Sequence, residues 1–336
     1  MRSLPGPAMH REIHGLFRLP SECSMTLTEQ VKQHARELGF DAVGVSRVTP
    51  DRPEAGRLNE WLARGYHGEM QWMSRTRAKR SNPALLLPGI RSIVSVGMNY
   101  YTDERPDELH GLGRIARYAR GTDYHAVLGD RLKSLTTFLC RKVPDSRAIS
   151  YVDTGPVMEK AWAQRAGLGW IGKHCNLVSA EHGSWLLLGD VLTTADLDPD
   201  EPAADLCGTC TLCIRACPTG AITEPYVLDA RRCLSYLTIE QKGRIPEEFA
   251  AAADNKIFGC DDCLDVCPYN HQANATAEPA FRATSLTLNP ELSSLASQSE
   301  GEFRATFKGS AVRRITHEGL QRTVATALTN RCSERP

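Results

Sequence analysis

Apolar residues recur at helical and strand spacing through the first two thirds of the chain. The first helix is expected to begin near Met25, because Thr26 and Glu29 form a capping box ahead of apolar residues at every third or fourth position. Gly39 and Gly65 are expected to end two of the helices. The pattern predicts helices over 25–39, around 58–65 and over 124–139, and strands over 42–45, 93–98, 148–152 and 185–192. This alternation of helices and strands predicts an α/β (α+β) domain.

An acidic residue follows the strand predicted over 148–152. Asp153 is succeeded by Thr154-Gly155-Pro156 and a predicted helix, in which Gly155 suits the cap and Pro156 the first helical position. Open α/β folds bind ligands beyond the carboxyl ends of their strands. Asp153 is therefore a candidate site residue. The alternative is a buried acid that pairs with Lys160 or with a backbone amide.

Positive charge is concentrated between Arg75 and Arg80, where four of six residues are basic. A solvated helix face is the simpler interpretation, and a surface for phosphates is the alternative. A second polar stretch, over 235–246, is expected to form a short loop that contains Gln241, Lys242 and Arg244, again with solvent exposure as the simpler interpretation. A last helix is expected over roughly 311–328.

Composition limits the compartment and the partners. The chain has 336 residues, 40 basic and 40 acidic side chains and a sequence pI near 7.1, so a nucleic-acid surface has to be a local patch. The sequence contains no run of about 18 apolar residues that would predict a membrane helix. Residues 1–24 lack the apolar core of a signal peptide. We expect a cytoplasmic protein with reduced thiols and no membrane partner.

Changes in composition divide the chain into four expected segments. Asp196 to Asp205 form an acidic linker that contains Pro199 and Pro202 and marks the main boundary. We expect a disordered leader over 1–24, an α/β domain over 25–195, a cysteine-rich domain over 196–285 and a helical C-terminal segment over 286–336.

Eight cysteines lie in and between two ordered runs. The first run, from Cys207 to Cys217-Pro218, has the bacterial ferredoxin spacing C-x2-C-x2-C-x3-C-P, whose fourth cysteine ligates the other cluster. The second run, from Cys260 to Cys267-Pro268, is one thiolate short, and Cys233 is the spare cysteine between the runs. The expected ligands of two 4Fe-4S clusters are Cys207, Cys210, Cys213 and Cys267 for cluster 1, and Cys217, Cys233, Cys260 and Cys263 for cluster 2.

Zinc sites and disulfides are the alternatives for these cysteines. Zinc would explain two C-x2-C pairs but would leave the prolines and the other thiolates without a role. A reducing compartment argues against disulfides. No chemistry is assigned to the four remaining cysteines, Cys23, Cys140, Cys175 and Cys332.

Two clusters side by side carry electrons, and a carrier alone needs only a cluster domain. The long domain that precedes the clusters should therefore hold an electron acceptor or a second cofactor. In their order along the chain, several stretches together resemble the epoxyqueuosine reductase family. They are the eight cysteines and the stretches from Arg117 to His125, Tyr151 to Lys160, Ala166 to Lys173, Ser235 to Glu240 and Gly309 to Arg314.

The resemblance implies a cobalamin-binding reductase domain followed by a ferredoxin-like domain with two 4Fe-4S clusters and a short helical C-terminus. It implies reduction of epoxyqueuosine to queuosine in the anticodon of tRNA, with electrons from an external low-potential donor, and we expect a monomer. By resemblance Asp153 is the proton donor, and we expect burial to raise its pKa so that it stays protonated. Lys160, Gln241, Lys242, Arg244 and Arg80 are expected to contact cobalamin or tRNA.

Other functions remain open from the sequence. One is a cobalamin-dependent reductase of another electrophile, such as an organohalide. Another is a ferredoxin-like electron-transfer protein fused to a binding domain, and a third is an RNA-binding protein with structural clusters.

Overall fold

A four-stranded antiparallel sheet lies at the centre of the computed structural model, which describes residues 25–333. Its strand order is β1 (Ala42–Arg47), β2 (Ser92–Asn99), β7 (Leu186–Thr193) and β4 (Ala148–Tyr151), and all three ladders are antiparallel. The fold is therefore of the α+β kind. The ligand rule for parallel sheets, which singled out Asp153, does not apply to an antiparallel sheet.

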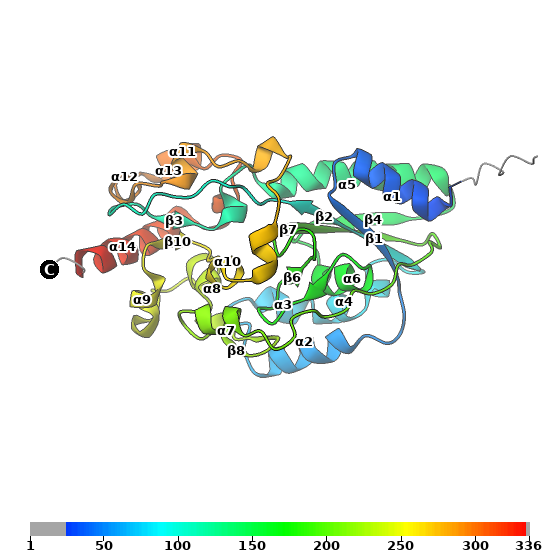
Figure 1. The fold of residues 1–336 in the computed structure, drawn as a ribbon, viewed down its shortest axis with the longest axis horizontal. Helices are drawn as coiled ribbons and strands as arrows, with labels where there is room; N and C mark the ends of the chain where they lie inside the picture. The colour runs from blue at the N-terminus through cyan, green and yellow to red at the C-terminus, as the bar shows by residue number, and fades with distance from the viewer. Residues whose placement is uncertain (1–24, 334–336) are drawn as a thin grey trace, which may run out of the picture.

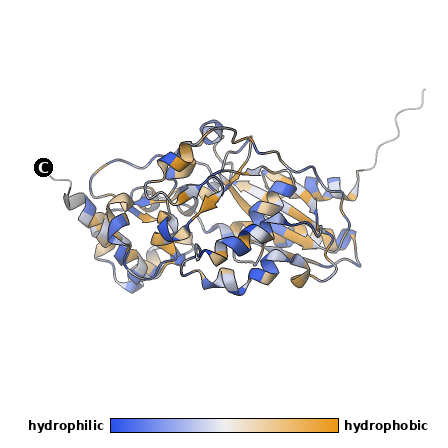
Figure 2. Ribbon diagram, turned by 90° about the horizontal axis from the view of Figure 1, so that it is seen from below, coloured by the Kyte–Doolittle hydropathy of each residue, from blue (hydrophilic) through white to orange (hydrophobic). Residues whose placement is uncertain are grey.

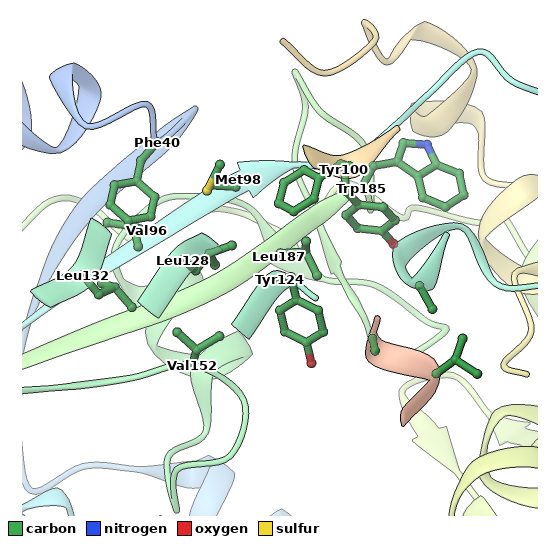
Figure 3. Packing of buried hydrophobic residues seen from close by; sticks show 14 of the residues in the cluster. Phe40, Val96, Met98, Tyr100, Tyr124, Leu128, Leu132, Val152, Trp185 and Leu187 are labelled. Carbon is green, nitrogen blue, oxygen red and sulfur yellow. The ribbon is translucent and has the colours of Figure 1, made fainter. Parts of the chain in front are cut away.

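Helices cover both faces of this sheet (Figure 1). α1 (Leu27–Glu37) and α5 (Tyr124–Lys142) pack on one face and α6 (Glu159–Arg165) on the other. Alternation along β7 decides which side chains each face receives, so Leu187 and Val191 join the core beside α5, while Asp190 points to the α6 side. Figure 3 shows Leu187 within this core, together with side chains from α5 and β2.

The remaining elements surround the sheet. Before α5 lie α2 (Pro53–Ala63), α3 (Gln71–Arg75), α4 (Arg77–Ser81) and β3 (Arg114–Ile115), and after α6 lie β5 (Trp170–Ile171) and β6 (Leu177–Val178). The cysteine-rich segment contains α7 (Leu212–Ala216), β8 (Ile222–Glu224), β9 (Val227–Leu228), α8 (Leu234–Ile239), α9 (Glu247–Ala253), β10 (Lys256–Phe258) and α10 (Asp262–Asp265). The last segment contains α11 (Ser285–Leu288), α12 (Leu292–Ala296), α13 (Glu300–Thr306) and α14 (His317–Ser333).

One hydrophobic core joins the sheet to the C-terminal segment. It includes Val96 of β2, Leu132 of α5 and Phe258 of β10, as well as Phe307 and Val324 near the end of the chain. Figure 2 shows the apolar colour concentrated on the central strands and polar residues on the outer helices. The boundaries expected at 195 and 285 stay predictions, and the leader over 1–24 lies outside the described residues. Within residues 25–333 no helix has the length and apolar character that a membrane crossing requires.

Local predictions were mostly confirmed. The capping box of Thr26 and Glu29 is formed, and Gly39 follows the helix with a φ of +85°. Two expectations for the part of the chain after residue 230 were wrong. The stretch over 235–246 is not all loop, because α8 fills its first part, and the last helix begins only at His317, after a 3-10 turn over Ala311–Arg314.

Candidate active site

Asp153 is at the apex of a tight turn that follows β4. Its φ is +50°, and the backbone N–H of Thr154 donates to the carbonyl of Val152 across it. A non-glycine residue held at positive φ in a three-residue turn stores roughly 1–3 kcal/mol of strain. The strained turn is retained because Val152 is buried in the main core and the loop after Asp153 is clamped from the other side.

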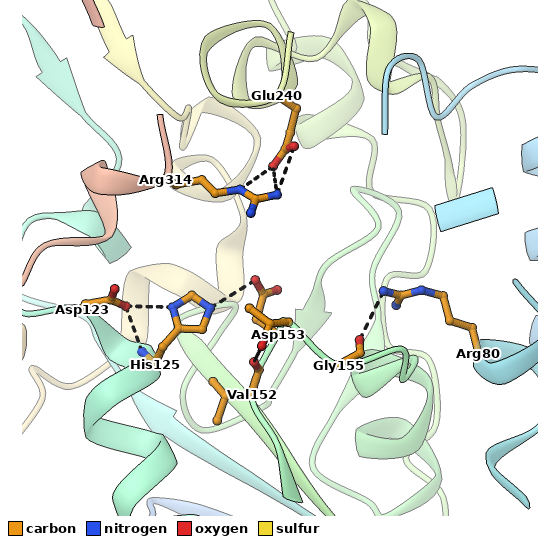
Figure 4. A network of polar contacts seen from close by, with 9 residues as sticks. Arg80, Asp123, His125, Val152, Asp153, Gly155, Glu240 and Arg314 are labelled. Atoms are coloured by element: carbon orange, nitrogen blue, oxygen red, sulfur yellow. Dashed lines mark hydrogen bonds and ion pairs between the residues drawn. The ribbon is translucent and has the colours of Figure 1, made fainter. Parts of the chain in front are cut away.

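The clamp is Arg80, at the end of α4. Its Nη1 donates to the carbonyl of Val157 at 2.7 Å and its Nη2 to the carbonyl of Gly155 at 3.2 Å (Figure 4). Gly155 fits here because a Cβ would lie 2.3 Å from the ring of Tyr151. Since this loop is anchored by Arg80, α6 begins at Glu159, and the expected helix start at Gly155-Pro156 was wrong.

Arg80 differs from the rest of its basic segment. Its side chain is buried, and its guanidinium lies 5.2 Å from the centre of the Trp72 ring. Arg75, Arg77 and Lys79 are exposed, which agrees with a solvated helix face. The contact of Arg80 with a cofactor stays a prediction, because its polar atoms are already used within the protein.

His125 lies next to Asp153, and Asp123 holds its imidazole ring on the opposite side. Its Nδ1 is 2.8 Å from Asp123 Oδ1, and its Nε2 is 3.5 Å from Asp153 Oδ2 (Figure 4). Asp123 is also the N-cap of α5, since it accepts the backbone N–H of His125 at 3.0 Å. The 3.5 Å contact is an ion pair without hydrogen-bond alignment, and within the described residues Nε2 has no better partner.

This arrangement places a proton on the histidine. The hydrogen bond to Asp123 is the largest cause that raises the pKa of His125 to about 9, and Asp153 contributes further. Interaction with His125 lowers the pKa of Asp153, although desolvation opposes this. The expectation of a protonated Asp153 was therefore wrong for the free protein. The Asp153 side chain is 65% exposed, so the carboxylate is surrounded by protein on one side only and keeps its charge beside an imidazolium.

Two further acids lie behind the turn. Burial raises the pKa of Glu159 to about 8, and the charges of Asp190 and Asp153 raise it further. Burial also raises the pKa of Asp190 to about 7, although the Ser95 hydroxyl donates to it at 2.6 Å. Glu159 Oε1 and Asp190 Oδ2 have no partner among the described residues, which favours their neutral forms.

An ion pair borders the space that Asp153 faces. Arg314 donates to the Glu240 carboxylate from Nε at 3.1 Å and from Nη2 at 3.0 Å. In Figure 4 this pair lies across from Asp153, with His125 and Arg80 on either side. In this view polar groups from four distant parts of the sequence lie around the exposed Asp153 carboxylate.

The other predicted contact residues differ in availability. Lys160 donates to the carbonyl of Cys175 at 3.0 Å and to the Asn176 side chain at 2.6 Å, so it is engaged. Gln241 donates to the carbonyl of Arg244 at 2.6 Å. Among the described residues, the exposed side chains of Lys242 and Arg244 make no hydrogen bond or ion pair. Their contact with cobalamin or tRNA stays a prediction.

The eight cysteines include two sets of neighbouring thiols, and their assignment as cluster ligands stays a prediction. Burial is the largest cause that raises the pKa values of Cys213 and Cys263, and neighbouring thiolates add to it. These neighbours are Cys207, Cys210 and Cys267 for Cys213, and Cys217, Cys233 and Cys260 for Cys263. None of these cysteines is in a disulfide. In residues 25–333 no three His, Cys, Asp or Glu side chains lie close enough together to hold one metal ion.

Protein groups also surround cluster 1. Trp170 Nε1 lies 3.4 Å from Cys207 Sγ, and the buried Lys173 donates to the carbonyls of Gly208 at 2.6 Å and Cys210 at 2.9 Å. The sequence stretch around Lys173 therefore holds the first cysteine loop in place. A positive charge and an N–H donor at this position offset the negative charge of a thiolate-bound cluster.

Sequence reasoning missed His125 and Glu159 as site residues. A signal for His125 existed, because Asp123-Tyr124-His125 has an N-cap acid two residues before the histidine. Glu159 carried no comparable signal, since its environment depends on Asp190 from a distant strand.

Two sequence profiles match the chain. One is described as "4Fe-4S double cluster binding domain" and matches residues 206–270, which contain all eight cysteines. The other is described as "Epoxyqueuosine reductase QueG, DUF1730" and matches residues 80–154, which include Asp153 and His125.

Proteins similar to this chain include characterised sequences and solved structures. An epoxyqueuosine reductase of Gloeobacter violaceus is 45% identical over 305 residues, which cover 89% of this chain and 95% of the relative. That of Escherichia coli K12 is 42% identical over 312 residues, covering 90% and 81%. A crystal structure of an epoxyqueuosine reductase with a tRNA-Tyr epoxyqueuosine-modified stem loop has a TM-score of 0.85 at 33% identity, covering 91% and 81%. The structure from Streptococcus thermophilus has a TM-score of 0.83 at 29% identity, covering 91% and 82%.

Proposed function

Because the chain belongs to the epoxyqueuosine reductase family, we propose that the site around Asp153 reduces epoxyqueuosine to queuosine in the anticodon of tRNA. The family membership makes the protein an oxidoreductase of queuosine biosynthesis with two 4Fe-4S clusters and cobalamin as cofactors. The roles of single residues, the tRNA contact, an external low-potential electron donor, a monomeric state and a cytoplasmic location are parts of the proposal.

The observation that carries the proposal is the pairing of Asp153 with His125 at an open side of the protein. Conversion of the epoxide to an alkene consumes two electrons and two protons and releases water. His125 holds one proton 3.5 Å from the exposed Asp153 carboxylate. Delivery of that proton to the leaving oxygen is general acid catalysis, which typically contributes 10²- to 10⁴-fold to a rate.

The residues that the resemblance assigns to the cofactor or to tRNA have polar groups that suit a large polar ligand. Cobalamin, when bound, supplies a cobalt centre that transfers electrons to the substrate. Lys242 and Arg244 have free cationic side chains for its phosphate or for the tRNA backbone, and Gln241 adds an amide beside them. Lys160 and Arg80 are held in place by hydrogen bonds within the protein, and the Asp153 side chain is 65% exposed.

The test is anaerobic turnover of an epoxyqueuosine-containing anticodon stem loop by protein loaded with iron, sulfide and cobalamin. Mass spectrometry of the released nucleoside should show loss of one oxygen, dependent on reductant and cobalamin. Asp153→Asn should abolish most turnover, because Asn tolerates positive φ but cannot relay the proton. Asp130→Asn, at an exposed acid on α5, is the matched control. If no product forms although both clusters and corrinoid are bound, the substrate is wrong, and organohalides become the next compounds to test.

A further inference from the structure

The loop that carries the first three thiols of cluster 1 lies at the surface of the protein. From Ala204 to Leu212 every residue except Cys207 and Cys210 is exposed. Figure 1 shows α7 and β8 at one edge of the molecule. Three of the cysteines expected to hold cluster 2 pack against hydrophobic core residues, Cys233 and Cys260 against a group that includes Leu234 and Tyr236, and Cys263 against the main core. An electron from outside the protein therefore meets cluster 1 first.

Large apolar side chains are exposed around this loop. Leu206 is 51% exposed, Leu212 38% and Tyr226 41%, and these are three of only seven large hydrophobic residues that are exposed in the described part of the chain. Tyr226 is connected to the cysteine loop, because its backbone N–H donates to the carbonyl of Lys173, whose Nζ donates to the carbonyls of Gly208 and Cys210. Clustered exposed apolar residues rimmed by polar groups are typical of interaction sites.

Tyr226 occupies a position that would suit glycine. It follows Pro225 in the two-residue turn between β8 and β9, and its φ is +69°. The ring is nevertheless kept on the surface, and its hydroxyl donates to the Asp205 carboxylate. Strain at an exposed aromatic residue is unexplained by packing and is characteristic of functional positions.

Acidic residues outnumber basic ones around these residues, although the exposed Arg215 follows Leu212 on α7 and the exposed Arg36 lines the same pocket as Leu206. From Thr193 to Ile214 the sequence contains five acids and no lysine or arginine. Asp196 and Asp200 are paired with basic residues of the sheet domain, but Glu201 and Glu224 are exposed and Asp205 meets only the Tyr226 hydroxyl and a backbone N–H. A partner that docks here should carry basic residues around its contact surface.

We propose that Leu206, Leu212 and Tyr226, rimmed by Asp205 and Glu224, form the surface on which a small one-electron carrier protein with a basic rim docks to reduce cluster 1. We call these five residues the docking patch. In each encounter the carrier loses one electron and cluster 1 gains it, so two encounters supply one substrate turnover. The inference rests on the proposed function in one respect, namely that the clusters pass electrons inward.

The test measures electron exchange directly and needs no tRNA. Holoprotein with chemically reduced clusters is mixed with ferric cytochrome c, a small carrier with a lysine-rich rim, and haem reduction is followed by stopped-flow absorbance. The rate constant should fall with rising salt and should fall about tenfold in Leu206→Ser, Leu212→Ser and Tyr226→Gly. Glu224→Lys should slow it further and flatten the salt dependence. Leu206→Ser lies next to Cys207 and can disturb cluster assembly. Tyr226→Gly stays informative in that case, because glycine adopts the positive φ of this position without strain and the turn should keep its fold.

Reoxidation by ferricyanide, a small anion that needs no docking surface, is the reference. The ratio of the cytochrome c rate to the ferricyanide rate should drop in the patch variants and stay constant in Leu109→Ser, whose side chain is 64% exposed elsewhere. Unchanged ratios in all three patch variants, or an equal drop in Leu109→Ser, would overturn the inference. A lowered ratio in a protein that gives no queuosine would leave the docking patch standing and reject the proposed substrate.

Discussion

Replacing His125 by glutamine should change the pH dependence of epoxide reduction. In the wild type the pKa of His125 is about 9, raised chiefly by the hydrogen bond to Asp123, so about 99% of the imidazole is protonated at pH 7. In His125→Gln the remaining acid is Asp153, and an ordinary carboxyl with a pKa near 4 is protonated in about one molecule in a thousand at pH 7.

The size of the effect follows from these populations. A thousandfold loss of protonated donor is partly offset, because a stronger acid transfers its proton faster. We therefore expect turnover at pH 7 to fall by about 10- to 100-fold. The wild-type rate should hold up to about pH 9 and decline above it, whereas the variant should already decline from about pH 5.

The assay is single-turnover reduction of the stem loop between pH 5 and 10, with nucleoside mass spectrometry and a chemical reductant in excess. His110→Gln, at an exposed histidine in the loop before β3, controls for loss of a histidine as such. The reasoning is refuted if His125→Gln retains both the rate and the pH profile of the wild type, since His125 would then hold no proton that the reaction uses.

Three further changes test the surroundings of the site. The pKa of Glu159 is raised from 4.5 to about 8, so the wild type loses stability as the pH rises through that interval. In thermal unfolding at pH 9, Glu159→Gln should therefore be more stable than the wild type by up to about 5 kcal/mol. The exposed Glu181→Gln should be no more stable than the wild type. Arg80→Lys removes the guanidinium group that donates to the carbonyls of Gly155 and Val157, so it should destabilise the protein by about 1.5–3 kcal/mol and lower turnover. In the exposed Arg77→Lys, the melting temperature and the turnover rate should stay unchanged. Cys233→Ala should retain about four irons and four sulfides per chain in chemical analysis, and Cys140→Ala about eight of each; two full clusters in the former would contradict the ligand assignment.

Features set by neighbouring residues could be predicted from the sequence. The capping box at Thr26 depends on a spacing of three residues. The two sets of neighbouring thiols follow from the cysteine spacing that is typical of domains with two 4Fe-4S clusters. Asp153 was singled out from a local pattern, a strand end followed by turn residues, and its role stays a prediction. The ligand rule used to justify it assumed a parallel sheet, however, and strand order is a non-local property that the apolar pattern does not contain.

Features set by distant contacts could not be predicted. Arg80 looked like part of a solvated basic face, yet it is buried because the carbonyls of Gly155 and Val157, some 75 residues later, accept its hydrogen bonds. The same contacts delay the start of α6, although Pro156 is a good first helical residue in isolation. The charge of Asp153 depends on His125, which is placed by the packing of α5 beside β4.

The charges around the turn reconcile the proposed role of Asp153 as proton donor with an ionised carboxylate in the free protein. Asp123 and Asp153 lie on either side of the His125 imidazolium, and Lys160 also favours the ionised form of Asp153. The Asp153 side chain is 65% exposed, so water still stabilises its charge. Substrate that covers this open side removes that water, and desolvation raises the pKa of the carboxylate. We therefore expect substrate binding to favour transfer of the His125 proton across the 3.5 Å from its Nε2 to Asp153 Oδ2, which would prepare the proposed acid.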